Sequence, residues 1–115
     1  ELGAAPALFN PAQLDFNGGT LRTTASLAID DATRGITTSS NGGRINTEVA
    51  TTLEVANVIT GTGRLEKVGF GTLALQGVNT LTGGLTVTEG VLSIGSEENL
   101  GANPTTLGGG DLVLN

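Results

Sequence analysis

The chain has 115 residues, a formal net charge of −6 from 11 acidic and 5 basic residues, and no His, Cys, Met, Trp or Tyr. This length fits one domain at most, or a segment of a longer protein. The missing His and Cys exclude the common zinc, haem, disulfide and Ser- or Cys-nucleophile systems. Five scattered cations and three Phe predict neither a nucleic-acid surface nor a base-stacking platform.

The first segment of the chain recurs near its end. Leu-Gly-Ala-Ala-Pro at residues 2–6 is matched by Leu-Gly-Ala-Asn-Pro at residues 100–104, an offset of 98 residues. At the same offset, Leu-Asp-Phe-Asn at 14–17 is matched by Leu-Val-Leu-Asn at 112–115. We therefore interpret residues 1–115 as one β-helical segment of a longer repetitive protein. It contains one long repeat over residues 2–99 and the start of the next copy over residues 100–115.

Residues 48–57 are the best helical candidate, because they follow Asn46 and carry acids early. The Thr51-Thr52 pair and the alternation of Leu53 and Val55 favour a strand instead. Elsewhere glycines recur every few residues, and each costs about 0.5–1 kcal/mol relative to Ala inside a helix. We therefore predict an all-β chain.

Apolar pairs at i, i+2 spacing recur along the second half of the chain with steps of 19 or 20 residues: Leu53/Val55, Leu73/Leu75, Leu92/Ile94 and Leu112/Leu114. A second series with steps of 20 residues consists of Ile45, Leu65 and Leu85. Such a period is typical of a solenoid, and each pair is typical of a short strand with one face inward.

The pattern predicts a parallel β-helix with coils of about 20 residues, and therefore roughly five coils in the long repeat. Leu53, Leu73, Leu92 and Leu112 should form one inward column. An antiparallel sandwich or small barrel is the alternative all-β fold, but hairpins do not explain equal steps along the chain. The two ends of the segment should expose unpaired strand edges, so we expect it to associate end to end.

Residues 61–95 resemble an autotransporter-associated β-strand repeat, also called the passenger-associated transport repeat. The resemblance rests on Gly-Thr-Gly-Arg-Leu-Glu-Lys-Val-Gly-Phe-Gly-Thr-Leu-Ala-Leu-Gln-Gly-Val-Asn-Thr at 61–80 and Leu-Thr-Gly-Gly-Leu-Thr-Val-Thr-Glu-Gly-Val-Leu-Ser-Ile-Gly at 81–95. Leu81, Leu85 and Val91 depart from the family pattern without disturbing the strands. The resemblance implies a right-handed parallel β-helix in a large secreted protein of the bacterial surface, exported unfolded and folding coil by coil outside the cell.

Four short motifs have a structural interpretation that outweighs a catalytic one. Residues 69–74 fit G-x-G-x-x-A, but a strand rather than a helix is predicted after the glycines, which argues against a dinucleotide site. Residues 108–111 match part of a glycine-rich calcium repeat without its ladder of Asp. The adjacent acids at 30–31 and 97–98 would face opposite ways in a strand, so we expect solvated loop positions.

Three further residue types have structural interpretations. Lys67 could pair with Glu66 or with a neighbouring coil in an exposed ion pair worth about 0–1 kcal/mol. Asn79 should close a turn or stack on an Asn of the next coil. The three Phe are expected as core or corner filler: Phe9, Phe16 and Phe70. We predict no catalytic, cofactor-binding or metal-binding residue.

Three function classes follow from these patterns. The favoured one is a structural stalk or fibre segment on the cell surface, whose partners are neighbouring repeats or end-to-end copies of itself. The alternative is an adhesin-like binding module that uses the side face of the β-helix for an unknown ligand. The least favoured is a polysaccharide-cleaving enzyme, because the acids are dispersed along the chain. Neither nucleic-acid binding nor membrane insertion by this segment is expected.

Overall fold

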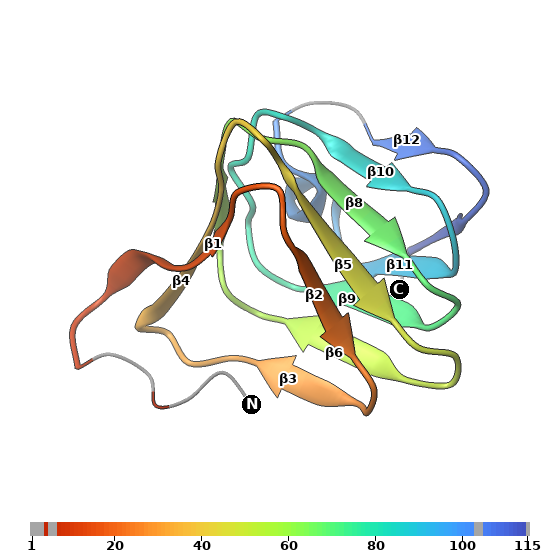
Figure 1. The fold of residues 1–115 in the computed structure, drawn as a ribbon, viewed down its shortest axis with the longest axis horizontal. Helices are drawn as coiled ribbons and strands as arrows, with labels where there is room; N and C mark the ends of the chain where they lie inside the picture. Colours follow the sequence, from red (N-terminus) through yellow and green to blue (C-terminus); the bar gives the residue numbers. More distant parts are fainter. Residues whose placement is uncertain (1–3, 5–6, 103–104, 115) are drawn as a thin grey trace.

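The computed structural model describes residues 4, 7–102 and 105–114, which form a β-solenoid (Figure 1). The chain runs through short strands joined by tight corners. In chain order these are β1 (Asn10–Phe16), β2 (Thr20–Thr23), β3 (Leu27–Ile29), β4 (Arg34–Thr38), β5 (Gly43–Thr47), β6 (Thr52–Val55), β7 (Ile59–Gly61), β8 (Leu65–Val68), β9 (Thr72–Leu75), β10 (Leu85–Val87), β11 (Val91–Ile94), the 3₁₀ helix η1 (Glu97–Leu100), β12 (Thr106–Leu107) and β13 (Asp111–Leu114).

The strands stack into three sheets, and every strand pairing is parallel. We call them sheet A (β1-β4-β7), sheet B (β12-β10-β8-β5-β2) and sheet C (β13-β11-β9-β6-β3). Sheets B and C each contain five strands, which corresponds to about four turns of the solenoid. The parallel solenoid predicted from the periodicity is confirmed, and the antiparallel alternative is wrong.

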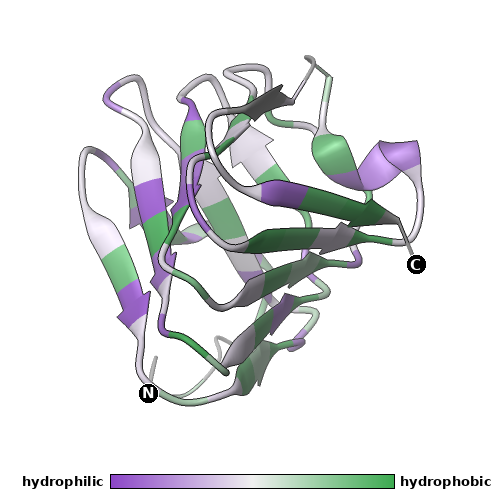
Figure 2. Ribbon diagram, turned by 90° about the vertical axis from the view of Figure 1, so that its right-hand side faces the viewer, coloured by the Kyte–Doolittle hydropathy of each residue, from purple (hydrophilic) through white to green (hydrophobic). Residues whose placement is uncertain are grey.

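The predicted leucine column is present in sheet C. Leu53 pairs with Leu73, Leu73 with Leu92, and Leu92 with Leu112. Leu27 extends the column at the other end by pairing with Leu53. The three interior leucines are fully buried, and Figure 2 shows the apolar segments of neighbouring strands lying above one another. Period-2 alternation within each strand therefore becomes a continuous core along the solenoid axis.

Residues 48–57 form strand β6 at their centre, Thr52–Val55, as the Leu53/Val55 alternation predicts. A corner at 48–51 precedes this strand, and Ala50 there adopts a positive φ of 61°. The helical alternative for this segment is therefore wrong, because the alternating side chains bury one face against the core.

The second predicted series is only partly correct. Leu65 pairs with Leu85, but Ile45 pairs with Lys67, two positions away from Leu65. The place opposite Leu65 is taken by Gly43, and a Cβ atom there would lie 2.3 Å from the Cβ of Phe16. The Phe16 ring fills the core that a larger residue at 43 would need, so this turn is longer than the turns that follow.

The 98-residue offset does not place matching residues in matching sheets. Leu14 lies in β1 and pairs with Ile36 in sheet A, whereas its counterpart Leu112 lies in β13 and pairs with Leu92 in sheet C. The motif at 2–6 and its copy at 100–104 fall mainly outside the described residues. A repeat spanning a whole number of turns is therefore not seen for this leucine pair.

Buried asparagines link successive turns at the corner between sheets C and A. The Asn79 amide donates to the Asn99 carbonyl at 2.6 Å, and its Oδ1 accepts from the Ile59 amide at 2.8 Å. Asn99 in turn donates to the Gly77 carbonyl at 2.8 Å. Asn79 thus closes a turn and bridges neighbouring coils, as its position predicts. These bonds satisfy corner backbone groups that are buried away from water.

The prediction for the three Phe is correct only for Phe16, which belongs to the core. Phe9 and Phe70 are 61% and 71% exposed. The reason is clear at Phe70, where a Cβ on Gly69 would lie 2.3 Å from the Thr47 carbonyl oxygen. The corner backbone presses so closely on the preceding turn that the intervening side chain points outward.

Candidate functional site

The motifs set aside in the sequence lie where their structural interpretation puts them. Strand β9 follows the glycines at 69–71, so a dinucleotide-binding strand–turn–helix is not formed. The acids at 30–31 are exposed, and those at 97–98 are exposed in the first turn of η1. Within the described residues, no group of three or more His, Cys, Asp or Glu could hold a metal ion. No helix in the described part of the chain could cross a membrane.

Lys67 is not part of an exposed ion pair. Its side chain is 2% exposed and lies in the core column of sheet B between Ile45 and Val87. Its Nζ donates to the carbonyls of Val68, Gly69 and Glu89 at 2.8, 2.7 and 3.2 Å. The prediction of a Glu66 partner is wrong because Lys67 points inward, while its strand neighbour Glu66 faces the other side of the sheet.

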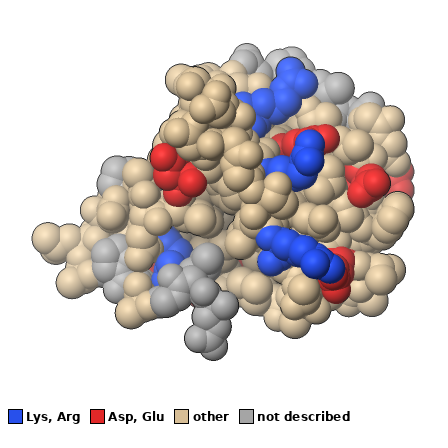
Figure 3. Space-filling model, in the orientation of Figure 1, with Lys and Arg blue, Asp and Glu red and all other residues tan. Residues whose placement is uncertain are grey.

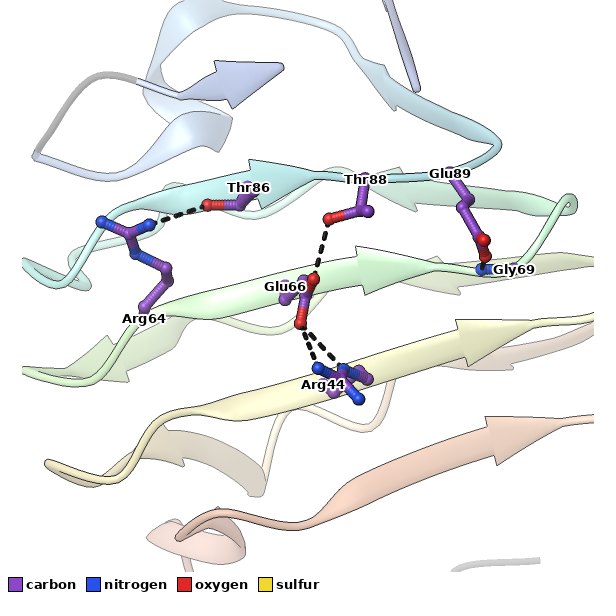
Figure 4. A network of polar contacts seen from close by, with 7 residues as sticks. All are labelled: Arg44, Arg64, Glu66, Gly69, Thr86, Thr88 and Glu89. Carbon is purple, nitrogen blue, oxygen red and sulfur yellow. Dashed lines mark hydrogen bonds and ion pairs between the residues drawn. The ribbon is translucent and has the colours of Figure 1, made fainter. Parts of the chain in front are cut away.

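A clasp between two turns results from this placement. The Lys67 ammonium reaches the backbone of the next turn at Glu89, and the Glu89 carboxylate accepts from the Gly69 amide at 2.8 Å (Figure 4). Burial lowers the pKa of Lys67 to about 8, and attraction to the Glu89 carboxylate partly offsets this. The charged amine therefore fixes a corner of the solenoid while satisfying three carbonyls.

The pH dependence of stability should report on Lys67. The pKa is about 8 in the folded chain against an ordinary 10.5, so between these values the unfolded chain holds a proton that the folded chain lacks. The free energy of unfolding should rise with pH over this window, by on the order of 1–3 kcal/mol. Urea unfolding at pH 7.5, 9 and 10.5 measures this slope.

The matched control is Lys67→Met, which should show no such rise. The chain has no His, Cys or Tyr and a single Lys, so few other groups titrate in this range. Glu89→Gln keeps the amine but removes the carboxylate, and should lower the onset of the rise. A wild-type stability that falls between pH 8 and 10.5 would contradict the assignment.

The exposed outer face of sheet B carries the feature that sequence reasoning missed. Arg22, Arg44 and Arg64 are all exposed, and the blue side chains in Figure 3 gather in a column over this sheet. Arg22 pairs with Glu48, and Arg44 with Glu66 at 2.7 Å. The cations are therefore aligned rather than scattered. Their spacing of 22 and 20 residues, close to the solenoid period, was the signal in the sequence.

A polar network joins the strands on this face (Figure 4). Thr88 donates to Glu66 at 2.7 Å, and Arg64 donates to Thr86 at 3.4 Å. The Thr88 hydroxyl, followed by Arg44, lowers the pKa of Glu66 below its usual value. Glu66 therefore stays ionised and links β5, β8 and β10. Each exposed ion pair adds only about 0–1 kcal/mol, so the network fixes side-chain positions more than it stabilises the fold.

An open groove of about 310 Å³ lies beside this network, where the corners between sheets A and B meet the first residues of β2, β5 and β8. Its lining is polar backbone and side chains: Gly18, Gly19, Thr20, Ser40, Asn41, Gly42, Gly43, Arg44, Arg64 and Glu66. The two arginines and one glutamate give the lining a net charge of +1 on a chain of net charge −6. The groove is the best candidate for a ligand site on the described surface.

The fold, with short parallel strands and glycine corners at a near-constant period, defines a repeat solenoid. Residues 65–94 match the family model described as passenger-associated-transport-repeat, so the chain contains a repeat of that family and the resemblance seen at 61–95 is confirmed. The adhesin BmaC autotransporter of Brucella suis biovar 1 (strain 1330) is 45% identical over 98 residues. These cover 84% of this chain and 3% of that protein. No solved structure matches the chain.

Proposed function

We propose that this chain is a structural segment of an autotransporter-type passenger, serving as a β-helical stalk or fibre on the outer surface of a bacterium. The observation that carries the proposal is the unbroken leucine column from Leu27 to Leu112 in sheet C. A core that continues from one turn to the next suits a part that adds length. The autotransporter relative and the passenger repeat at 65–94 support export to the cell surface.

The same stacking suggests how such a segment folds. Each turn contacts only its neighbours, so stability grows turn by turn and folding can propagate along the axis. The Lys67 clasp and the Asn79 bridge each join one turn to the next. Outside the cell, each added turn would then resist backward movement of the chain. The lack of Cys suits this route, because no disulfide can form in an unfolded chain that crosses an oxidising compartment.

The role is proposed as structural rather than catalytic. On the outer face of sheet B, Glu48 and Glu66 are engaged by arginines instead of facing each other as an acid–base pair. The division into one long repeat over residues 2–99 and a further copy from 100–115 also remains a prediction. Its partners would be neighbouring repeats of the same protein.

A second function is an adhesin-like binding module on the side face, and the arginine column with its adjoining groove favours it. The relative that matches over 84% of this chain is named an adhesin, a property stated of that whole protein. The two functions are compatible, because a stalk can carry a binding site on its side.

Self-association tests the structural proposal. Leu27 and Leu112, at opposite ends of the sheet C column, are 41% and 37% exposed, so each end presents core surface and a strand edge. Analytical ultracentrifugation of the 115-residue chain should show association that grows with concentration. Leu112→Lys should weaken this association at least about tenfold, which is about 1.4 kcal/mol.

The control is Glu54→Lys, an exposed position on the interior strand β6 of the same sheet. It adds a similar charge to the side of the solenoid and should leave association unchanged. A stable, well-folded monomer at high micromolar concentration would contradict end-to-end growth. Equal suppression by the two variants would assign the contact to the sides instead.

A further inference from the structure

We propose that the groove at the corner between sheets A and B binds a short saccharide that carries a carboxylate, with Arg64 as the residue that recognises the acid group. This inference adds a ligand site to the stalk and does not depend on end-to-end assembly. It assigns a place and a ligand class to the side-face binding function proposed above.

The shape and lining of the groove indicate a small polar ligand. Its volume of about 310 Å³ lies near the lower end of the range of ligand sites, about 300–1,000 Å³. The floor is open at Gly19, where an added Cβ would meet no atom within 4 Å. The lining residues include no aromatic side chain, so neither a nucleobase nor an apolar peptide is favoured.

The charges in the lining favour a carboxylate over a more highly charged group. Arg44 is held by Glu66 through its Nε and Nη2, at 2.8 and 2.7 Å. Arg64 makes only a long bond from Nη1 to the Thr86 hydroxyl, at 3.4 Å, so its guanidinium can turn a planar fork toward an anion. The Glu66 carboxylate beside it would repel a dianionic phosphate.

The remaining groups supply partners for sugar hydroxyls. Asn41 donates from Nδ2 to Asn17 at 2.7 Å, which leaves its role in the groove to the amide oxygen as an acceptor. Ser40 and Thr20 add hydroxyl groups to the lining, and Glu66 adds a carboxylate. Donors and acceptors thus alternate around a basic residue, which is the pattern that a sugar acid needs.

Titration of the ¹⁵N-labelled chain with sodium glucuronate, followed by NMR, tests the inference. Shifts should be confined to amides of residues 18–20 and 40–44 and to the neighbourhood of Arg64. Glucose, which lacks the carboxylate, and acetate, which lacks the sugar, should each bind at least about tenfold more weakly. Arg64→Gln should weaken glucuronate binding by about tenfold and leave the rest of the spectrum unchanged.

Arg22→Gln is the matched control, because Arg22 lies on the same face, outside the groove, and is already paired with Glu48. It should bind glucuronate like the wild type. Equal affinity for acetate, equal affinity for glucose, or no shifts at tens of millimolar glucuronate would each overturn the inference. Those results would leave the ultracentrifugation test of the stalk unaffected.

Discussion

Truncation of Leu75 to alanine should lower the free energy of unfolding by about 2–5 kcal/mol. Leu75 is 1% exposed and lies in the middle of sheet C, between Val55 of the preceding turn and Ile94 of the next. A cavity at this place cannot be closed by one neighbour, because hydrogen-bonded strands above and below fix the spacing. Equilibrium urea unfolding followed by circular dichroism measures the loss.

Thr88→Ser provides the comparison. Thr88 is half-buried, and its hydroxyl donates to Glu66, a bond that serine can keep. The variant should change stability by no more than about 0.5 kcal/mol. Equal losses at the two positions would mean that the assignment of inward and outward faces is wrong.

Gly83→Ala should destabilise the solenoid by about 3 kcal/mol or more, because no side-chain rotation can relieve the contact. A Cβ at Gly83 would lie 2.1 Å from the carbonyl carbon and oxygen of Gly63 in the preceding turn. Gly63 is itself pressed on Ser39, with an added Cβ 1.8 Å from that carbonyl oxygen. One methyl group therefore has to push two turns apart.

Gly19→Ala is the matched glycine replacement, since Gly19 lies in a corresponding corner and an added Cβ meets nothing within 4 Å. Its stability should stay within about 1 kcal/mol of the wild type, with a slight gain from the stiffer unfolded chain. Thermal unfolding of both variants gives the comparison. A Gly83→Ala protein as stable as Gly19→Ala would show that the turns are not stacked as closely as described.

The sequence predicted the solenoid well because its strongest signal was physical repetition. The steps between Leu53, Leu73, Leu92 and Leu112 are the turn length itself, and identical neighbours in the core need identical spacing. The strand over 52–55 followed from alternation alone. These features are local and periodic, so they can be recognised without knowing which residues meet in space.

Other features required the fold. Ile45 pairs with Lys67 because the Phe16 ring fills the space beside Gly43, a contact between distant residues that no period reveals. Lys67 is buried because three backbone carbonyls converge on its amine. The arginine column was visible as a spacing, but its significance depended on the turn length and on which face each strand turns outward.

The burial of Lys67 has a practical consequence for following this protein in solution. The chain contains one lysine, and the fold encloses its amine between two turns. An amine-reactive reagent should therefore modify this side chain only when the corner opens, at a rate set by the local opening equilibrium. Labelling of a single defined atom would then report whether the middle of the solenoid opens by itself or only together with its ends.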